Sequence, residues 1–229
     1  MQEISIVIPV FNEEQNINTL YNEITKNLLK KYNFEIIYIN DGSTDNTKSI
    51  LKNLYKSKFI NIVEHDKNLG QSRSILSGIK KSKFQNIVTI DGDGQNNPID
   101  IPKLLDLYFS NNYDLVAGIR TKRKDNIIKI VSSKIANKIR SSILKDNCPD
   151  TGCSLKVFNK HVFLEFPYFD GIHRFLPALF KCYNKKIHFV SVGHRPRIKG
   201  ISKYGTIDRL FKGIYDLYRV RNIIKKHTK

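Results

Sequence analysis

Two aspartates, Asp91 and Asp93, are separated by one glycine at the end of an apolar run, in the stretch NIVTIDGDGQNNP (86–98). Two like charges about 4 Å apart near a protein surface repel by on the order of 4 kcal/mol, so the pair is expected to bind a cation. Mg²⁺ and Mn²⁺ take hard oxygen ligands, typically one or two carboxylates together with substrate phosphates. We therefore interpret the pair as a bridge between a divalent metal and a diphosphate. The alternative is a simple turn, because Asp and Gly are common turn residues.

Three further groups of polar residues follow apolar runs in the same way. They are PVFNEE (9–14), NDGSTDNT (40–47) and HDKNLG (65–70). Ligands of open α/β sheets lie beyond the carboxyl ends of the strands, so four such groups on one sheet predict a ligand-binding edge. Taken singly, each group is explained by a turn or a helix cap. A dinucleotide site is disfavoured, because carboxylates stand where the backbone amides of a GxGxxG loop would meet a pyrophosphate.

In the first 120 residues, short apolar runs rich in β-branched residues alternate with segments of helical period. Strands are expected at 4–11, 34–40, 60–65, 86–91 and 113–119, and helices near 13–30, 44–56, 70–82 and 98–110. Ser43 or Thr44 is expected to cap the second helix, and Pro98 to begin the fourth. Nearly continuous apolar character indicates strands that are buried on both faces. The pattern predicts an α/β sandwich with a mostly parallel sheet.

Two segments of the C-terminal half have basic, amphipathic character. IIKIVSSKIANKIRSSIL (127–144) and GTIDRLFKGIYDLYRVRNIIKK (205–226) place apolar residues at helical spacing, with Lys and Arg between them. Helices of this kind usually pack their apolar stripe on the domain. They also have the composition of helices that lie in the headgroup layer of an anionic membrane. No internal repeat or Pro-rich linker interrupts the sequence, so residues 1–229 are expected to form a single domain.

The chain of 229 residues has 39 Lys+Arg against 21 Asp+Glu and a formal net charge of +18. This excess suggests an anionic partner, although a composition rich in Lys, Asn and Ile explains part of it. Three cysteines without a CxxC spacing indicate a reduced, cytoplasmic environment. No signal peptide is recognised, and no apolar run reaches the ~20 residues of a membrane span. We expect a protein that is soluble or peripheral on the inner face of the cell membrane.

The polar motifs, taken in order, resemble those of a known family. SIVIPVFNEEQNI, IIYINDGSTDNT, NLGQSRSILSGI and TIDGDGQNNP have the order and spacing found in family 2 glycosyltransferases with the GT-A fold. The later stretches DTGCSLKVF (150–158), FDGIHRFLP (169–177) and HRPRIKGISKYG (194–205) are similar to those of the dolichol- or undecaprenyl-phosphate sugar transferases within this family. The resemblance implies a GT-A-type Rossmann-like sandwich. Its nucleotide-sugar-binding half would be 1–119, and its acceptor-side half 120–229.

The resemblance also implies roles for individual residues. It assigns to the donor pocket Pro9, Phe11, Asn12, Glu13, Asp41, Gly42, Ser43, Asp91 and Gly92. Asp41 would face the base or ribose, and Asp91 would lie against the ribose and diphosphate. Asp93 and Gln95, with Asp91 beside them, would hold Mg²⁺ or Mn²⁺.

Two positions near the proposed metal depart from the family pattern. Gly94 stands where many relatives have a bulkier apolar residue, and Asn97 stands where Asp is frequent. Neither difference removes a proposed metal ligand. Both alter residues that neighbour the proposed ligands. Many bacterial relatives also have C-terminal membrane spans, and no such span is recognised in this sequence.

The implied reaction is inverting, metal-dependent transfer of a sugar from a UDP- or GDP-linked donor. Candidate cations for the phosphates are Arg120, Arg123, Arg140, Arg195, Arg197, Lys199 and Lys203, of which the last four belong to a loop that would close over phosphates. Arg120 and Arg123 are also explained as solvated surface charges. A phosphomonoester has a second pKa near ~6, so at neutral pH it is already an anionic nucleophile.

The identity of the acceptor decides the role of Asp150. If a hydroxyl is the acceptor, Asp150 is the candidate base; otherwise it orients an Arg or His in the site. His173 and Arg174 occupy the place of a loosely matched Q-x-x-R-W motif, for which a packing role is equally consistent.

The leading hypothesis is transfer to a polyprenyl phosphate at an anionic membrane surface. An alternative is a family 2 enzyme that acts on a sugar hydroxyl of a lipid-linked glycan or polysaccharide. A basic nucleic-acid-binding module would explain the charge, but no binding motif accompanies it, so no nucleic acid partner is expected. An inactive scaffold is disfavoured, because the acidic motifs are present together.

Overall fold

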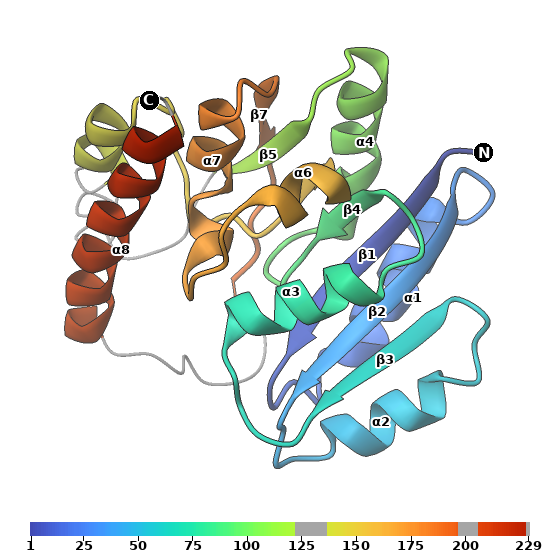
Figure 1. Cartoon of the computed structure of the whole chain (residues 1–229). Helices are drawn as coiled ribbons and strands as arrows, with labels where there is room; N and C mark the ends of the chain where they lie inside the picture. Colours follow the sequence, from blue (N-terminus) through green and yellow to red (C-terminus); the bar gives the residue numbers. More distant parts are fainter. Residues whose placement is uncertain (122–136, 197–205, 228–229) are drawn as a thin grey trace.

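The computed structural model of the chain describes residues 1–121, 137–196 and 206–227, and over 206–212 it describes the backbone alone (Figure 1). Within these ranges seven strands form one sheet in the order β3-β2-β1-β4-β6-β5-β7. The strands are β1 (Glu3–Val10), β2 (Asn33–Asp41), β3 (Ile60–His65), β4 (Asn86–Thr89), β5 (Leu115–Arg120), β6 (Lys156–Asn159) and β7 (Ile187–Val192). All neighbouring pairs are parallel except those of β6, which is antiparallel to β4 and β5. The expected mostly parallel sheet is confirmed.

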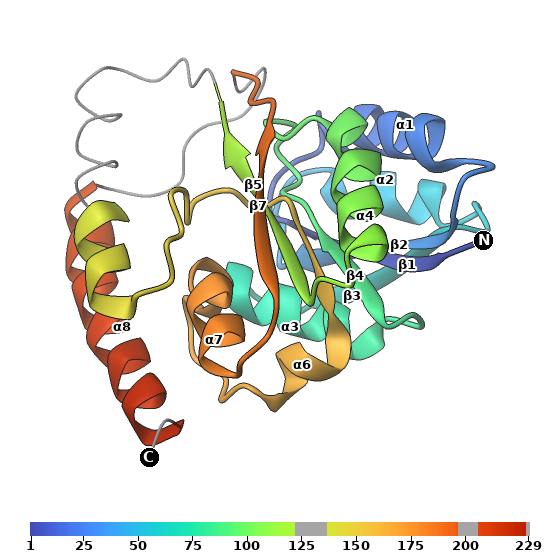
Figure 2. The same cartoon turned by 90° about the horizontal axis from the view of Figure 1, so that it is seen from above.

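Helices cover both faces of this sheet (Figure 2). They are α1 (Ile17–Leu28), α2 (Thr47–Leu54), α3 (Gln71–Lys81), α4 (Ile101–Ser110), α6 (Lys160–Glu165), α7 (Leu176–Cys182) and α8 (Thr206–His227), with short 3-10 helices at η1 (Pro98–Asp100) and η2 (Ile172–Arg174). Residues 137–144 are also helical. Helices α1 and α4 pack on one face of the sheet, and α3, α6 and α7 pack on the other.

The central strands are buried on both faces, as their continuous apolar character predicts. In β1, Ile6 and Ile8 belong to the apolar cluster under α1 and α4, whereas Val7 between them belongs to the cluster under α3 and α7. Alternate side chains of a strand point to opposite faces, so a strand between two helical layers must be apolar throughout. The strand β6 comes from the C-terminal half and lies between β4 and β5, so one sheet joins both halves of the chain.

The start of α2 differs from the expectation. The helix begins at Thr47, and the backbone N–H of Thr47 donates to the Asp45 carboxylate at 2.9 Å. Ser43 and Thr44, the expected caps, instead bond Asn12 in the loop after β1. A predicted cap assumes a local partner, and here Asn12, 31 or 32 positions away in the chain, donates to both hydroxyls, from its backbone N–H to Ser43 and from its side-chain amide to Thr44. Pro98 does begin a helical turn, η1, in which the Asn97 side chain accepts from the N–H of Ile99.

Helix α8 lies along the side of the molecule against α7, and the helix 137–144 lies beside it in both views (Figures 1 and 2). The inner side of α8 contributes Leu217, Val220 and Ile224 to the cluster around α7. Its outer side exposes Ile214, Tyr215 and Tyr218. The first part of the expected helix 127–144 lies outside the described residues.

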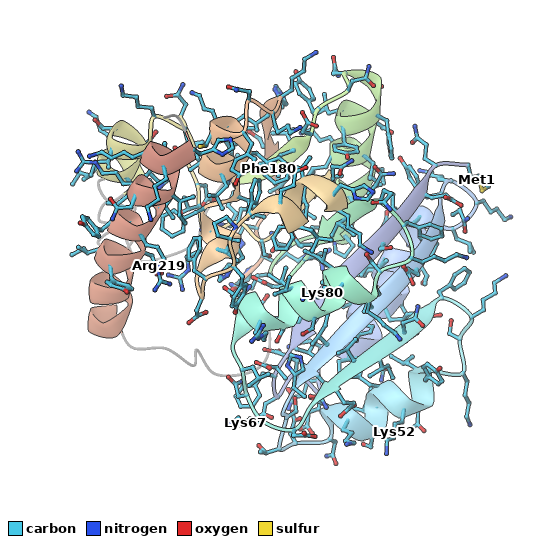
Figure 3. The ribbon with its side chains drawn as sticks, viewed as in Figure 1. Met1, Lys52, Lys67, Lys80, Phe180 and Arg219 are labelled. Atoms are coloured by element: carbon cyan, nitrogen blue, oxygen red, sulfur yellow. The ribbon has the colours of Figure 1, made fainter. Side chains whose placement is uncertain are left out.

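The positive charge is spread over the surface. Lys52, Lys67 and Lys80 project outward from α2, from the loop after β3 and from α3 (Figure 3). Among the described helices, none combines the length and apolar composition that a bilayer span requires.

A buried ion pair fixes the end of the helix 137–144. Arg140 donates to both carboxylate oxygens of Asp146, at 2.5 and 3.1 Å, and to the carbonyl oxygen of Cys148 at 2.9 Å. Both side chains are shielded from solvent, with Asp146 only 1% exposed. The role in phosphate binding expected of Arg140 is therefore less favoured than a structural one.

Asp146→Ala should lower the free energy of unfolding by about 3–5 kcal/mol, because it leaves the Arg140 charge buried without its partner. Urea unfolding followed by circular dichroism measures this loss. The double variant Arg140→Met/Asp146→Leu removes both charges and should lose much less. An equal loss in both variants would contradict this account of the pair.

Candidate active site

The polar groups predicted to share one sheet edge do so. The parallel registers pair Val10 of β1 with Asn40 of β2, and Asp41 of β2 with His65 of β3. Strand β4 is also parallel to β1, with Thr89 opposite Val7. The segments that follow these four strands therefore leave the sheet at the same edge, where ligands of open α/β sheets bind.

The loops after β1 and β2 are bonded to each other, which shapes the pocket wall expected to bind the nucleotide. The backbone N–H of Asn12 donates to the Ser43 hydroxyl at 2.9 Å, and the Asn12 side-chain oxygen accepts from the N–H of Thr44 at 2.8 Å. The N–H of Glu13 donates to the Thr47 hydroxyl at 2.9 Å. Asn12 has a φ of 53°, a conformation that Asn tolerates better than most residues. These bonds hold Asn12, Glu13 and Ser43 in one fixed group.

Asp41 is buried, and its carboxylate bonds groups of its own chain. It accepts from the backbone N–H groups of Leu69 and Gly70, at 2.9 and 2.8 Å. His65 Nδ1 lies 2.7 Å from the same carboxylate, and His65 Nε2 lies 3.0 Å from the Ser77 hydroxyl. Asp41 therefore fixes the loop after β3, and the contact with base or ribose that the sequence suggested stays a prediction.

Glycine is required at two of the predicted donor-binding positions. Gly42 has a φ of +71°, and a Cβ there would lie 2.5 Å from the backbone of Lys67. At Gly92 a Cβ would lie 2.5 Å from a side-chain carbon of Val10 and 3.1 Å from the carbonyl oxygen of Pro9. The strand-end loops are thus packed backbone to backbone, which brings Pro9 and the DGD motif together.

Asp91 is under electrostatic strain. Its partial burial and the neighbouring Asp93 carboxylate raise the pKa of Asp91 from 3.8 to about 6. A hydrogen bond with Ser154 and the positive charges of Lys156 and Arg120 act in the opposite direction but do not cancel the rise. The Asp91 carboxylate also accepts from the Gln71 side chain at 2.7 Å. A cation placed beside the two aspartates would relieve this strain.

The segment 91–97, which we call the metal loop, is held by the chain on both sides. The Ser154 hydroxyl accepts from the N–H of Asp91 at 3.1 Å and donates to the Asn96 side chain at 2.7 Å. On the other side, the N–H of Arg195 donates to the Gln95 carbonyl oxygen at 2.8 Å. A prebuilt loop of this kind lowers the entropic cost of gathering metal ligands.

The oxygen atoms of the metal loop fit Mg²⁺ or Mn²⁺. Gln95 Nε2 donates to the carbonyl oxygen of Arg195 at 3.4 Å, and the Gln95 backbone N–H donates to the Asp93 carboxylate at 3.1 Å. Gln95 Oε1 is therefore the side-chain atom that could serve as the predicted metal ligand. Among the described residues, no group of three or more His, Cys, Asp or Glu side chains forms a metal cage. Such a site suits a cation that takes one or two carboxylates from the protein and further oxygens from substrate phosphates.

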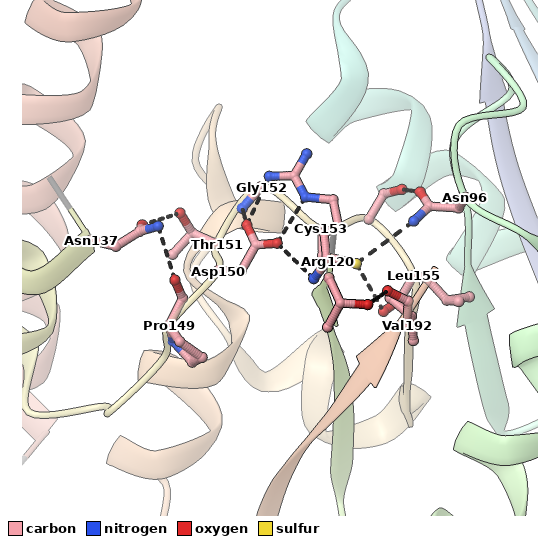
Figure 4. Close-up of polar contacts among 12 residues, drawn as sticks. Asn96, Arg120, Asn137, Pro149, Asp150, Thr151, Gly152, Cys153, Leu155 and Val192 are labelled. Atoms are coloured by element: carbon pink, nitrogen blue, oxygen red, sulfur yellow. Dashed lines mark hydrogen bonds and ion pairs between the residues drawn. The ribbon is translucent and has the colours of Figure 1, made fainter. Parts of the chain in front are cut away.

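Asp150 and Arg120 form a two-pronged ion pair (Figure 4). Arg120 Nε and Nη2 each donate to one Asp150 oxygen at 2.8 Å, and the Arg120 backbone N–H adds a third bond at 3.1 Å. The N–H of Gly152 donates a fourth, also at 3.1 Å. A carboxylate has about four lone-pair sites, so these four donors fill the acceptor capacity of Asp150. The geometry matches the predicted role in which Asp150 orients an arginine.

The remaining predicted residues are dispersed. His173 Nδ1 bonds the Ser72 hydroxyl at 2.7 Å, and His173 lines a small cavity with Gln71, Ser154 and Lys156 on the α3 side of Asp91. Arg174 ends η2. Arg195 lies at the opposite side of the metal loop, near α1. Arg123, Arg197, Lys199 and Lys203 lie outside the described residues.

Several side chains that shape the site have no role among those predicted from the sequence. His65, Gln71, Ser154 and Lys156 all lie close to the predicted aspartates. His65 ends a strand that was predicted, so its position was a usable signal. Ser154 and Lys156 belong to the quoted stretch DTGCSLKVF, but their position beside Asp91 depends on β6, a strand of four residues that was not predicted.

Asp41, Asp91 and Asp93 lie at the carboxyl edge of the sheet, which we call the acidic edge. The sheet order, the metal loop and the acidic edge define a glycosyltransferase fold of the GT-A type. Residues 5–166 match the family model described as Glycosyl transferase family 2. This match covers well over half of the chain, and the chain belongs to that family.

Two relatives belong to the subgroup that the later motifs resemble. A dodecaprenyl-phosphate galacturonate synthase of Rhizobium johnstonii is 34% identical over 227 residues, which cover 95% of this chain and 66% of that protein. An undecaprenyl-phosphate 4-deoxy-4-formamido-L-arabinose transferase of Aeromonas hydrophila is 30% identical over 218 residues, which cover 93% of this chain and 66% of that protein. The chain thus spans 66% of the length of each of these relatives.

Solved structures share the fold at low sequence identity. Glucosyl-3-phosphoglycerate synthase from Mycobacterium tuberculosis, in complex with Mn²⁺, UDP and glucosyl-3-phosphoglycerate, has a TM-score of 0.70 at 15% identity. The alignment covers 96% of this chain and 78% of that one. The same enzyme in complex with Mg²⁺ and UDP also has a TM-score of 0.70. The likeness confirms the expected GT-A-type architecture.

The raised pKa of Asp91 predicts a stability effect with a defined sign. In the folded state the carboxyl holds its proton up to about pH 6, whereas in the unfolded chain it loses the proton near 3.8. The wild type should therefore lose stability as the pH rises from about 4 to about 6, and Asp91→Asn should not. At pH 7 in EDTA, Asp91→Asn should be more stable by between about 1 and 3 kcal/mol.

Chemical unfolding of the two proteins at several pH values measures this difference. At pH 4 the two should be nearly equal in stability. A variant that is less stable than the wild type at pH 7 would show that Asp91 carries no such strain.

Proposed function

We propose that the protein transfers a sugar from a nucleotide-diphosphate sugar to a polyprenyl phosphate, with Mg²⁺ or Mn²⁺ in the metal loop and inversion at the anomeric carbon. The observation that carries this proposal is the saturation of Asp150, whose carboxylate already accepts four hydrogen bonds. A hydroxyl acceptor needs a base, and the candidate base has no acceptor capacity left. A phosphate acceptor needs none, because it is already an anion near neutral pH.

The donor would lie along the acidic edge. Its base and ribose would occupy the wall made by Asn12, Glu13 and Ser43, and its diphosphate would face Asp93 and Gln95. The metal ion supplies positive charge that stabilises the departing nucleoside diphosphate. The chain itself holds the ligand oxygens in place, through the bonds from Ser154 and Arg195 to the metal loop.

Arg120 would position the phosphate of the acceptor. Asp150 takes the N–H of Nε and one N–H of Nη2, so among the described contacts the edge formed by Nη1 and the second N–H of Nη2 is left to meet an anion. The pairing fixes the plane of the guanidinium before the substrate arrives, which suits bidentate recognition of phosphate. The side chain is mostly buried, so it is not one of the freely solvated surface charges.

The names of the relatives agree with this reading. The Rhizobium and Aeromonas proteins are named for transfer of sugars to dodecaprenyl and undecaprenyl phosphate. The structural neighbours were solved with UDP and with Mn²⁺ or Mg²⁺, which supports a divalent metal and a nucleoside diphosphate here.

The membrane surface would be reached through α8 and the helix 137–144. Ile214, Tyr215 and Tyr218 of α8 are 58–64% exposed, and Ile139 and Ile143 are exposed on the neighbouring helix. Arg221, Lys225 and Lys226 follow on α8. Exposed apolar and tyrosine side chains next to basic residues suit the headgroup region of an anionic membrane. An acceptor with a long apolar tail would be presented at that surface.

Transfer to undecaprenyl phosphate in detergent, with Mn²⁺ and radiolabelled UDP- and GDP-linked sugars, tests the proposed function. A labelled lipid product should form with the phosphate acceptor and not with undecaprenol, because the alcohol lacks the anionic nucleophile. The rate should rise as the pH passes about 6, the second pKa of the phosphate.

Two variants sharpen the test. Asp93→Ala should abolish transfer, and Asp150→Asn should raise the acceptor KM about tenfold with the same pH profile, since one charge-assisted contact is disturbed. Transfer to undecaprenol at a comparable rate, with loss of all activity in Asp150→Asn, would support the hydroxyl-acceptor alternative instead.

Binding to sedimented vesicles tests the membrane surface. Ile214→Ser/Tyr218→Ser should weaken partitioning to anionic vesicles at least about tenfold, because burial of one large side chain contributes on the order of 1.5 kcal/mol or more. Tyr55→Ser is the matched control, since Tyr55 is as exposed as Tyr215 but lies at the end of α2. Equal binding by all three proteins would contradict a role for α8.

A further inference from the structure

The side chain of Arg195 bridges α1 and the metal loop. Arg195 Nη1 donates to the two carboxylate oxygens of Glu23, at 2.8 and 3.0 Å, and Nη2 donates to the Asn97 side-chain oxygen at 2.5 Å. Glu23 lies on α1, 172 positions earlier in the chain. The ion pair is half-buried, with side chains 31% and 30% exposed. It lines a pocket whose wall also includes Asp93 and Gly94.

The backbone of Arg195 is bonded to the same loop. Its N–H donates to the Gln95 carbonyl oxygen at 2.8 Å, and its carbonyl oxygen accepts from Gln95 Nε2 at 3.4 Å. One residue further back, His194 forms a β-bridge with Asn96. Arg195 therefore contacts Gln95 through its backbone and Asn97 through its guanidinium, and its position fixes the orientation of the Gln95 amide.

We propose that Glu23 is a positioning residue for the divalent cation. By holding the Arg195 guanidinium against Asn97, it fixes the end of the metal loop and turns Gln95 Oε1 toward the cation. The inference rests on the proposed function, because it assumes that the metal loop binds a cation. It gives Arg195 a role in the metal loop that differs from direct contact with the donor phosphates.

Glu23 supplies the negative charge that holds the Arg195 guanidinium in place. Asn97 is neutral, so among the described contacts of the guanidinium the negative charge comes from Glu23. Residues that orient metal ligands from behind typically change metal affinity or activity by about 10- to 100-fold when they are substituted. Glu23 belongs to a partly exposed pair, so its removal should leave global stability nearly unchanged.

The experiment measures Mn²⁺ binding directly, by the electron paramagnetic resonance signal of free Mn²⁺ titrated with the whole chain. Glu23→Gln should raise the Mn²⁺ dissociation constant about tenfold. Arg195→Met should raise it by a similar factor, and the double variant Glu23→Gln/Arg195→Met should lose no more than either single variant, because both residues act through one bridge. Glu165→Gln, which removes the same charge from an exposed position on α6, should have no effect.

Thermal unfolding without metal serves as the control for folding. The variants should unfold within a few degrees of the wild type, since a partly exposed ion pair contributes little to stability. If Glu23→Gln alone unfolds early, Glu23→Asp provides a second variant that keeps the charge. It should bind Mn²⁺ more tightly than Glu23→Gln.

The outcomes separate this inference from the proposed function. Mn²⁺ binding that is equal in the wild type and Glu23→Gln, but lost in Asp93→Asn, would overturn the role of Glu23 and leave the metal site standing. Tighter binding in Glu23→Gln would also overturn it, since Glu23 would then compete for Arg195. Absence of Mn²⁺ binding by the wild type would overturn both the metal site and the inference.

Discussion

The crowding of Asp91 and Asp93 at the carboxyl edge of the sheet is the constraint around which the site is organised. Parallel pairing of β1, β2 and β4 brings the ends of these strands together, and Gly92 lets the DGD motif pack directly against Pro9 and Val10. The resulting proximity of two carboxylates raises the pKa of Asp91. The packing on both faces of the sheet stabilises the fold despite this unfavourable arrangement. A strained polar group of this kind is typical of ligand-binding sites.

The other charged groups around the site are paired with groups of the chain and hold neighbouring segments in position. Asp150 is saturated by Arg120 and Gly152, and Asp41 is bonded by the loop after β3. Among the described residues, the carboxylates at the carboxyl edge of the sheet thus include one pair under electrostatic strain, Asp91 and Asp93. This division supports the proposal that the metal binds at the DGD motif and that Arg120 positions the acceptor anion. It also favours the proposed phosphate acceptor over a hydroxyl acceptor.

The sequence predicted the first half of the fold well, because β1 to β5 and α1 to α4 have strong local patterns. Strands buried on both faces are continuously apolar, and the helices between them have clear periods. The strands β6 and β7 and the helices α6 and α7 were missed. Strand β6 has four residues and is stabilised by antiparallel pairing with β4 and β5, which no local pattern encodes. The motifs predicted that the acidic residues share one edge of the sheet, whereas the bridge from Glu23 to Arg195 depends on a contact across 172 positions.

The release of protons on Mn²⁺ binding tests most directly whether the strained carboxylates form the cation site. Titration calorimetry at about pH 5.5, repeated in two buffers of different ionisation enthalpy, counts the protons released, because a metal displaces protons from its ligands. The wild type should release between roughly 0.5 and 1 proton, falling toward zero near pH 8, and Asp91→Asn should release none. Equal release by the wild type and Asp91→Asn, or none by either while Mn²⁺ still binds, would contradict the account.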